Sequence, residues 1–325
     1  MNKDFWKNKH VLITGFEGFL GSRLTQTLLT AKAKVVGLDI KTYRKETILA
    51  PSDYKRMAVY QGSVANYKLV RKILPDHSID IIFHLAAEAI VGENQQKPLK
   101  AFESNIKGTW TVLEAGRKCG RIEAVVVASS DKAYGSHKKI PYREEMPLLA
   151  NHPYDVSKSC ADLVAHTYAH TYDFPVAITR CGNIFGPGDF NFSRIIPDAI
   201  RCALTKKKLL IRSDGKFTRD YVYVDDIVNG YILLAEKLNK LNLAGEAFNF
   251  SEEKPRTVLE VVQAISRATG HKLQYKILNK ARYEIKDQYL DSQKSKRILG
   301  WRPRFSFTQG LRKTISWHQS ALSID

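Results

Sequence analysis

A tyrosine and a lysine four residues apart form the first pair of side chains in this sequence that could act together on a substrate. Tyr154 and Lys158 lie in a stretch with helical patterning, and four residues make about one turn, so both project from one face. A phenol titrates near ~10 in water and is a weak base at neutral pH. A nearby ammonium favours the phenolate, which suits the pair to accept a proton from a substrate hydroxyl. The spacing alone is common, so its meaning depends on the groups around it.

A serine, an aspartate and a lysine follow an apolar strand predicted at 124–129. Ser130, Asp131 and Lys132 would stand at the carboxyl end of a parallel strand, where open α/β sheets bind ligands. Burial would keep Asp131 protonated as an acid and would lower the pKa of Lys132 toward that of a base. Lys132 could instead stay charged and stabilise a developing negative charge, and the sequence does not choose. The simpler alternative is that Asp131 caps a turn and Lys132 is solvated.

Three glycines between a predicted strand and a predicted helix are the third chemical feature. The run is Gly15, Phe16, Glu17, Gly18, Phe19, Leu20 and Gly21. Such glycines allow a tight turn, backbone approach to a diphosphate and close helix packing, and the helix N-terminus attracts the anion. Asp39 ends the next predicted strand and can accept from both adenosine ribose hydroxyls. We therefore expect NAD rather than NADP, a preference that the nearby Lys41 and Arg44 weaken.

These groups need a scaffold, and the hydrophobic pattern predicts one. Strands are expected at 11–14, 35–39, 57–61, 79–84, 124–129 and 176–181, and helices at 20–30, 67–74, 99–118, 154–172, 225–237 and 257–268. The alternation predicts an α/β fold of Rossmann type, a doubly wound parallel sheet, with a smaller C-terminal substrate-binding lobe. We expect residues 1–180 to form the dinucleotide-binding domain, with about 218–250 returning to it, and 181–325 to form mainly the lobe.

Composition narrows the partners and the compartment. The 325 residues carry 51 Lys+Arg against 33 Asp+Glu, a net charge of +18. The surplus is spread along the chain, with Lys206–Lys208 the only short basic cluster, so we expect a small anionic substrate and no nucleic acid. Four separate cysteines and a lone His84 indicate reduced thiols and no metal site. Without an apolar run of ~20 residues or a signal-peptide pattern, we expect a cytoplasmic protein with no membrane partner.

Further segments resemble the motifs of one enzyme family. Residues 84–87 read HLAA, residues 105–109 read NIKGT, residues 180–187 read RCGNIFGP, residues 219–226 read RDYVYVDD and residues 299–303 read LGWRP. Together with the glycine run and the Tyr154–Lys158 pair, they resemble the extended branch of the short-chain dehydrogenase/reductase superfamily. That branch comprises NAD-dependent nucleotide-sugar epimerases and dehydratases. The resemblance covers about residues 10–303.

The resemblance implies a role for each matching residue. The expected catalytic residues are Ser130, Asp131, Lys132, Tyr154 and Lys158. The expected NAD-binding residues are Gly15, Phe16, Glu17, Gly18, Phe19, Leu20, Gly21, Asp39, Ser63, Val64, Leu85, Ala86, Ala87, Asn105, Tyr154 and Lys158. Ser63 stands where the family usually has an aspartate that contacts the adenine. A serine can still hydrogen-bond to the adenine, but less strongly. The expected substrate-binding residues are Asn183, Arg194 and Arg219, whose amide and guanidinium groups suit a nucleotide diphosphate.

Positions 131 and 132 separate two reactions within this family. Simple 4-epimerases resemble a serine-rich pattern here and need no further acid or base, whereas 4,6-dehydratases carry an acid pair, usually Asp-Glu. The pair Asp131–Lys132 resembles the CDP-glucose 4,6-dehydratases, as do Gly188–Asp189 and Arg194–Asp198. The resemblance therefore implies conversion of CDP-glucose to its 4-keto-6-deoxy form. The steps would be oxidation at C4, loss of water across C5 and C6, and return of the hydride to C6.

Two alternatives stay open, and a homodimer is expected. The first alternative is an NAD-dependent 4-epimerase acting on a UDP-sugar, which would use every residue above without demands on Asp131 and Lys132. The second is a non-catalytic nucleotide-binding or RNA-binding protein on the same fold, suggested by the positive charge.

Family members commonly pair the helices corresponding to 99–118 and 154–172 across a two-fold axis, which implies a homodimer.

Overall fold

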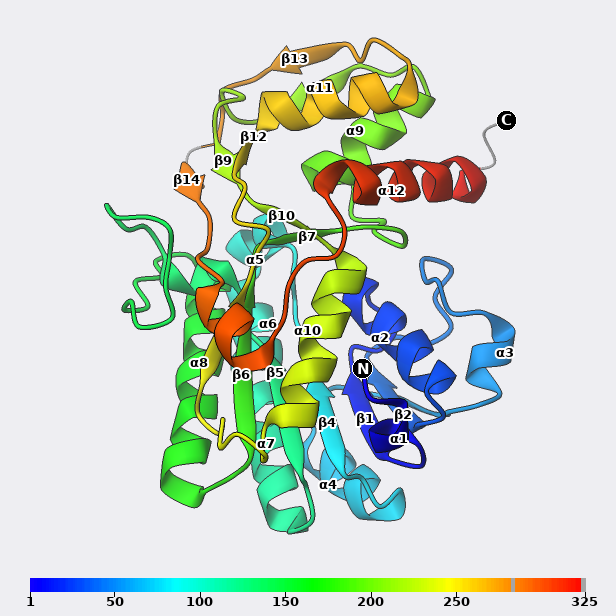
Figure 1. The fold of residues 1–325 in the computed structure, drawn as a ribbon, viewed down its shortest axis with the longest axis vertical. Helices are drawn as coiled ribbons and strands as arrows, with labels where there is room; N and C mark the ends of the chain where they lie inside the picture. Colours follow the sequence, from blue (N-terminus) through cyan, green and yellow to red (C-terminus); the bar gives the residue numbers. More distant parts are fainter. Residues whose placement is uncertain (282–283, 323–325) are drawn as a thin grey trace.

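A seven-stranded sheet forms the centre of the structure, a computed structural model that describes residues 1–281 and 284–322 (Figure 1). All its neighbouring strands are parallel, in the order β11-β6-β5-β4-β1-β2-β3. The strands are β1 (His10–Thr14), β2 (Lys34–Asp39), β3 (Ala58–Gln61), β4 (Ile81–His84), β5 (Ala124–Ala128), β6 (Val176–Cys181) and β11 (Ala247–Phe250). The order reverses between β1 and β4, the point at which doubly wound sheets bind their ligands. The predicted fold class is confirmed.

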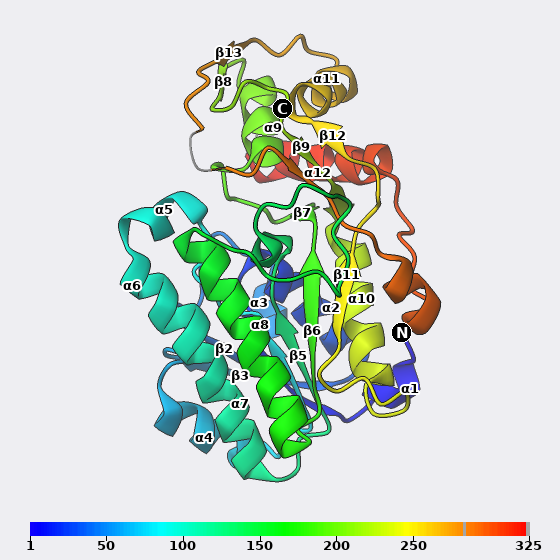
Figure 2. The ribbon, with the colours of Figure 1, turned by 90° about the vertical axis from the view of Figure 1, so that its left-hand side faces the viewer.

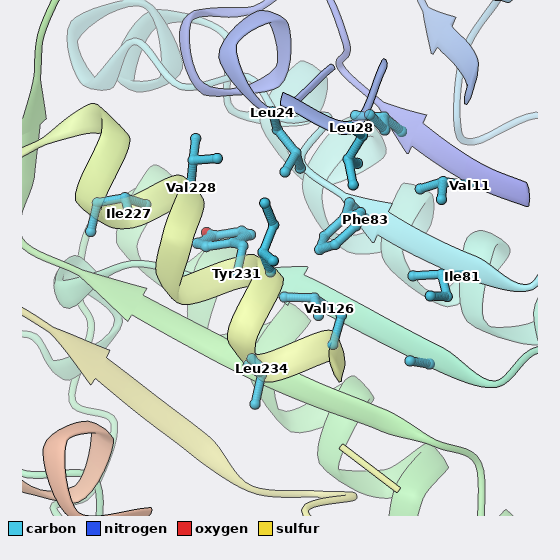
Figure 3. Close-up of a cluster of buried hydrophobic side chains, with 14 of the residues drawn as sticks. Val11, Leu24, Leu28, Ile81, Phe83, Val126, Ile227, Val228, Tyr231 and Leu234 are labelled. Atoms are coloured by element: carbon cyan, nitrogen blue, oxygen red, sulfur yellow. The ribbon is translucent and has the colours of Figure 1, made fainter. Parts of the chain in front are cut away.

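Helices cover both faces of this sheet (Figure 2). One face packs α2 (Phe19–Thr30) and α10 (Val224–Lys237), and the other packs α4 (Tyr67–Asp76), α7 (Gly108–Cys119) and α8 (Pro153–Tyr172). Alternation along β1 explains this division, because Val11 and Ile13 face the first layer while Leu12 faces the second. Figure 3 shows the first core, to which Tyr231 of α10 and Phe83 of β4 both belong.

A smaller lobe stands above the carboxyl ends of the strands (Figure 1). It has its own buried cluster, formed by its helices and by short two- and three-stranded sheets. Its helices are α9 (Ile195–Leu204), α11 (Val258–Thr269) and α12 (Phe307–Ala321). Its strands are β7 (Asn183–Phe185), β8 (Leu209–Ile211), β9 (Thr218–Arg219), β10 (Tyr221–Tyr223), β12 (Arg256–Thr257), β13 (Tyr275–Ile277) and β14 (Asp287–Gln288).

The remaining elements are short. They are α1 (Lys3–Trp6), α3 (Pro51–Tyr54), α5 (Val91–Gln96), α6 (Pro98–Ala101), a π-helix at Phe102–Lys107, a 3-10 turn at Asp131–Tyr134 and a second π-helix at Ser295–Leu299. The chain returns to the sheet twice after entering the lobe. First α10 and β11 join it, and then Leu299 and Trp301 enter the first core. No helix in the described ranges is long and apolar enough to cross a bilayer.

The structure differs from the predicted helices in three places. The single helix expected at 99–118 is divided into α6, the π-helix and α7, because the π-helix inserts extra residues between two α-helical segments. The helices α9 and α12 were not expected. A signal for α12 was present, since Ser306 and Gln309 form a capping box at its start. For α9, Pro197 in the first turn disguised a helix start as a loop.

Candidate active site

The glycine run forms a tight turn with an open helix N-terminus. Gly15 has φ +71°, and a Cβ atom there would lie 2.9 Å from the backbone nitrogen of Ala86. A Cβ atom at Gly21 would lie 2.0 Å from the carbonyl oxygen of Gly15, so only glycine lets α2 pack this closely. Gly18 caps α2 without a side chain, which leaves the first amides of the helix to a ligand. This cradle fits the diphosphate of a dinucleotide.

Glu17 lies inside this turn, but its side chain points away from the helix N-terminus. The carboxylate is 1% exposed and accepts hydrogen bonds from the amides of Tyr43 and Arg44 at 2.6 and 2.8 Å. It also accepts from the Tyr54 hydroxyl at 2.8 Å. Its amide donates to Asp39 over 3.4 Å. The Glu17 side chain therefore fixes the loop after β2, and its backbone belongs to the glycine turn.

Asp39 stands at the end of β2 as expected, and Arg44 lies against it. The carboxylate is 5% exposed, and Arg44 Nη2 donates to its Oδ1 at 2.5 Å. Burial raises the pKa of Asp39, and the charge of Arg44 opposes that rise. The pair explains in geometric terms why Arg44 weakens the preference for NAD: it offsets the negative charge that would repel a 2′-phosphate.

A network of hydroxyls fixes the backbone of residues 85–87. The Thr14 hydroxyl accepts from the amides of Leu85 and Ala86, each at 3.2 Å, and contacts His84 Nδ1 at 2.8 Å. The other ring nitrogen, Nε2, lies 3.1 Å from the Thr109 hydroxyl. Burial lowers the pKa of His84 to about 3, so the ring is neutral. Both ring nitrogens of His84 are therefore engaged by threonine hydroxyls of the fold.

Asn105 acts on the same segment through the π-helix. Its Oδ1 accepts from the Glu88 amide at 2.7 Å, and its Nδ2 donates to Glu88 O at 3.2 Å and to Ser157 Oγ at 2.8 Å. The amide is 1% exposed and is used up by these contacts. Asn105 thus ties the chain after β4 to α8 at Ser157, in the turn that carries Tyr154 and Lys158.

The remaining expected NAD-binding residues lie around the turn in different environments. Phe16 is fully buried in the first core, and Val64 is 5% exposed in the second. Ser63 accepts from the Ala65 amide at 3.1 Å, so it also closes a turn. The half-buried residues are Phe19, Leu20, Leu85, Ala86 and Ala87.

The predicted catalytic residues lie together at the ends of β5 and α8. Lys158 Nζ lies 6.0 Å from the centroid of the Tyr154 ring and donates to the carbonyl oxygen of Ala128 at 2.7 Å. Burial lowers the pKa of Lys158 to about 8. Burial also raises the pKa of Tyr154 to about 12, although a hydrogen bond with Ser130 opposes this rise. The sequence had suggested that a nearby ammonium would lower the pKa of Tyr154. In the structure this pKa is raised instead, because the effect of desolvation is larger than that of the surrounding charges and hydrogen bonds.

Asp131 and Lys132 are both turned into the protein. Asp131 is 3% exposed; its Oδ1 accepts from the Ser130 hydroxyl at 3.1 Å, and its Oδ2 has no partner among the described residues. Burial raises its pKa. Burial likewise lowers the pKa of Lys132, whose Nζ donates to Gln288 Oε1 at 2.7 Å. Ser130 caps the 3-10 turn, a role that the simpler reading had given to Asp131.

Three buried polar residues near this pair were not predicted as site residues, although Asp220 lies within the 219–226 motif. They are Asp155, Asp220 and Gln288, and each has one side-chain atom without a described hydrogen-bond partner. Burial raises the pKa of Asp155 to about 6 and that of Asp220 to about 7. The charge of Asp131 adds to both rises, which places the carboxyls in one electrostatic cluster. Asp155 directly follows Tyr154, but sequence alone does not reveal its burial.

The expected substrate residues line the lobe side. Arg219 is 7% exposed, and its Nη1 donates to the carbonyl oxygens of Thr218 and Lys286 at 2.7 and 3.0 Å. Arg194 precedes α9 and contacts the buried Asp189 at 3.3 Å. Its charge opposes the raised pKa of Tyr154, which links it to the catalytic pair. Asn183 begins β7 and is half-buried. Cationic groups thus face a buried acid–base cluster, an arrangement suited to proton transfer on an anionic substrate.

Comparison with known proteins agrees with this geometry. The family model described as "NAD dependent epimerase/dehydratase family" matches residues 11–250. A CDP-glucose 4,6-dehydratase of Salmonella typhimurium is 29% identical over 341 residues, covering 98% of this chain and 93% of that protein. A UDP-glucuronate 4-epimerase of Thermodesulfobacterium geofontis is 28% identical over 330 residues, covering 97% and 98%. Dehydratases and epimerases are thus about equally similar to this chain.

A solved structure extends the likeness to three dimensions. The dTDP-glucose 4,6-dehydratase of Bacillus anthracis, in complex with NAD, superposes with a TM-score of 0.85 at 29% identity. The match covers 96% of this chain and 97% of that one. It includes both the sheet and the lobe.

Proposed function

Because this chain belongs to the NAD-dependent epimerase/dehydratase family, whose model matches residues 11–250, we propose that it is a nucleotide-sugar 4,6-dehydratase with CDP-glucose as substrate. The observation that carries the proposal is the buried Asp131, with one oxygen bonded to Ser130 and the other unpartnered among the described residues. A 4-epimerase needs no such acid. The Asp131–Lys132 pair and the similarity to the Salmonella CDP-glucose 4,6-dehydratase favour CDP-glucose among the possible substrates.

The first step is proton removal from the sugar O4. Ser130 follows β5 and shares a hydrogen bond with Tyr154 in the first turn of α8, so both would reach the same substrate hydroxyl. Tyr154 accepts the O4 proton, and Lys158 stabilises the phenolate that results. When bound, NAD would supply an acceptor for the C4 hydride that later returns it to C6, and its oxidised ring would place a positive charge beside Tyr154 only until that hydride is accepted.

The second step is loss of water. Once C4 is a carbonyl, the C5 proton is acidic, and Lys132 removes it or stabilises the negative charge on O4. C5 takes up a proton again when the hydride returns to C6. Asp131 donates its proton to the departing C6 hydroxyl, which leaves as water. Burial raises the pKa of Asp131, which favours its protonated form, and lowers the pKa of Lys132, which favours the free amine.

The candidate substrate-binding residues favour an anionic sugar nucleotide. Arg219 and Arg194 supply fixed positive charge on the lobe side, and Asn183 supplies a neutral donor. In this proposal the residues near 1–180 and 218–250 hold NAD, while 181–325 hold mainly the nucleotide sugar. The diphosphate then lies between the two parts.

The test is incubation with a panel of CDP-, dTDP-, UDP- and GDP-hexoses, followed by mass spectrometry of the products. A dehydratase gives a product lighter by one water from CDP-glucose, whereas an epimerase leaves the mass unchanged. Chromatography that resolves glucose from galactose nucleotides detects the epimerase. If no nucleotide sugar in the panel gives a product lighter by one water, the proposed dehydratase activity is refuted.

The alternative, a UDP-sugar 4-epimerase, is favoured by one finding. Relatives that carry this name are about as similar to the chain as the dehydratases are. It would require only Ser130, Tyr154 and Lys158. Under this alternative Asp131→Asn would retain activity, which the dehydratase would not.

We also propose a homodimer through the helices at 98–119 and α8. Large apolar side chains are exposed there: Leu99 is 80% exposed, Trp110 45% and Leu163 59%. A second copy would cover them in a four-helix bundle. Sedimentation at micromolar concentration tests this, and a species with only the 36.9 kDa mass of one chain would refute it.

A further inference from the structure

A glutamine far along the sequence holds the side chain of Lys132. Gln288 is fully buried on β14, and its Oε1 accepts from Lys132 Nζ at 2.7 Å. Within the described residues, no other hydrogen bond from this ammonium group is found. β14 pairs with β9 so that Gln288 stands opposite Arg219. The Gln288 amide therefore lies between Lys132, a candidate catalytic residue, and Arg219, a candidate substrate-binding residue.

The other end of this amide has no partner. Gln288 Nε2 is buried and makes no hydrogen bond to any residue of 1–281 or 284–322. A buried N–H group without an acceptor is costly, and a native protein that keeps one commonly satisfies it with a ligand or water. Asp131 and Asp155, which interact electrostatically with Lys132, also leave an oxygen unpartnered. The amide is thus ready to donate to an oxygen from outside the chain.

An amide has a different effect on Lys132 from that of a carboxylate. A carboxylate would form an ion pair and favour the ammonium form, whereas an amide oxygen accepts from ammonium and free amine alike. Burial lowers the pKa of Lys132 first, and the charge of Arg219 lowers it further. The charges of Asp131, Asp155 and Glu284 act in the opposite direction. Gln288 fixes the lysine without adding to these opposing charges.

We propose that Gln288 positions Lys132 through its Oε1 and donates through its Nε2 to an oxygen of the hexosyl diphosphate. This inference rests on the proposed function in one respect, because it assigns Lys132 to the elimination of water. The contact to Lys132 itself requires no particular substrate. The two parts can therefore be tested separately.

The first experiment measures Lys132 without catalysis. The full chain with NAD is labelled by isotopic formaldehyde and cyanoborohydride over a range of pH, and peptide mass spectrometry follows Lys132. In Gln288→Glu the midpoint of labelling should rise by about one pH unit or more, since the new carboxylate favours the ammonium. In Gln288→Met, which lacks the acceptor, the midpoint should not rise and labelling should be faster. Gln293→Glu, an exposed change of the same type nearby, is the control and should leave the midpoint unchanged.

An unchanged midpoint in Gln288→Glu would overturn the positioning role. Should that variant fail to fold, by far-ultraviolet circular dichroism, the labelling rate in Gln288→Met decides: an unchanged rate would also overturn it. A raised midpoint in a chain that dehydrates no nucleotide sugar would support the positioning role and refute the proposed function. The two failures are therefore distinguishable.

The second experiment measures the donated hydrogen bond. In Gln288→Met the Kd for CDP-glucose should rise about tenfold while the Kd for NAD stays constant. In Gln288→Glu the limb of the kcat–pH profile that reports Lys132 should move to higher pH. A lower kcat with unmoved limb and unchanged Kd for CDP-glucose would indicate only a structural role and overturn the proposal.

Discussion

Two buried polar clusters lie near β6, and they treat their hydrogen-bonding groups in opposite ways. In the first, Arg180 donates to both oxygens of Asp162 at 2.8 Å and to the Tyr134 hydroxyl at 2.8 Å. Tyr134 donates in turn to Asn249 at 2.8 Å. In the second, around Asp131 and Lys132, the side chains of Asp131, Asp155, Asp220 and Gln288 each keep one atom without a described partner.

The difference separates structure from chemistry. In the Arg180 cluster charges are paired with bidentate geometry, so the cluster is rigid and leaves nothing for a ligand. The Asp131 cluster has raised carboxyl pKa values and free donors and acceptors, which cost stability and which a bound substrate can satisfy. Buried charge alone therefore does not identify a site; what distinguishes the Asp131 cluster is that several unsatisfied groups gather in one place.

The largest expected effect comes from breaking the satisfied cluster. Arg180→Met leaves Asp162 as an unpaired buried carboxylate, and the free energy of unfolding should fall by about 3–5 kcal/mol. Urea denaturation measures this. The double variant Arg180→Met with Asp162→Leu should recover much of the loss, because no unpaired charge remains. A loss below about 1 kcal/mol in the single variant would contradict the comparison.

The corresponding change in the other cluster should affect activity and spare the fold. In Asp131→Asn, dehydration should fall by about 10²-fold or more, since the proton donor is lost. The unfolding free energy should stay the same or rise, because a buried acid is replaced by a neutral group. Reduced nicotinamide absorbance should still appear on addition of substrate, because oxidation at C4 is retained. Normal dehydration would refute the acid assignment.

The pH dependence of stability should sharpen the contrast. The pKa of Asp155 is raised to about 6 from an ordinary 3.8, so the fold binds its proton more tightly than the unfolded chain does. The stability from this group is present below pH ~4 and is lost as pH rises through ~6. Asp155→Asn should abolish this loss and be more stable than the natural chain at pH 7 by about 1–3 kcal/mol. Thermal unfolding at pH 4 and 7 tests this, and a constant difference would contradict it.

The smallest effect is expected at Glu17, a satisfied carboxylate inside the cofactor turn. Glu17→Gln keeps the shape but replaces two charge-assisted hydrogen bonds from the 43–44 backbone, and should cost about 1 kcal/mol of stability. The affinity for NAD should fall with it, because the loop carrying Arg44 loosens beside Asp39. Calorimetric titration with NAD is the measurement. Equal loss of NAD affinity in an exposed control such as Gln293→Glu would argue against a local cause.

The sequence by itself determined the scaffold and pointed to the candidate reacting groups. Apolar runs of strand length separated by helical patterns permit a parallel sheet, and side chains at strand ends then fall at its carboxyl edge. The need for glycine at position 21 was predictable from the sequence, because contact with the Gly15 carbonyl tolerates no Cβ atom. The pairing of Tyr154 with Lys158 was predictable because both belong to one helix. These features are local, so local spacing reports them.

Only the tertiary structure decided the surroundings of those groups. Gln288 reaches Lys132 across 156 positions of sequence, and no spacing rule connects them. Arg44 closes on Asp39 because Glu17 holds the loop between them. The π-helix directs Asn105 to Glu88 and Ser157. The raised pKa of Tyr154 follows from desolvation, which depends on every chain segment that covers the ring. Burial and long-range pairing are properties of the packed chain, and they set how acidic, basic or available each group is.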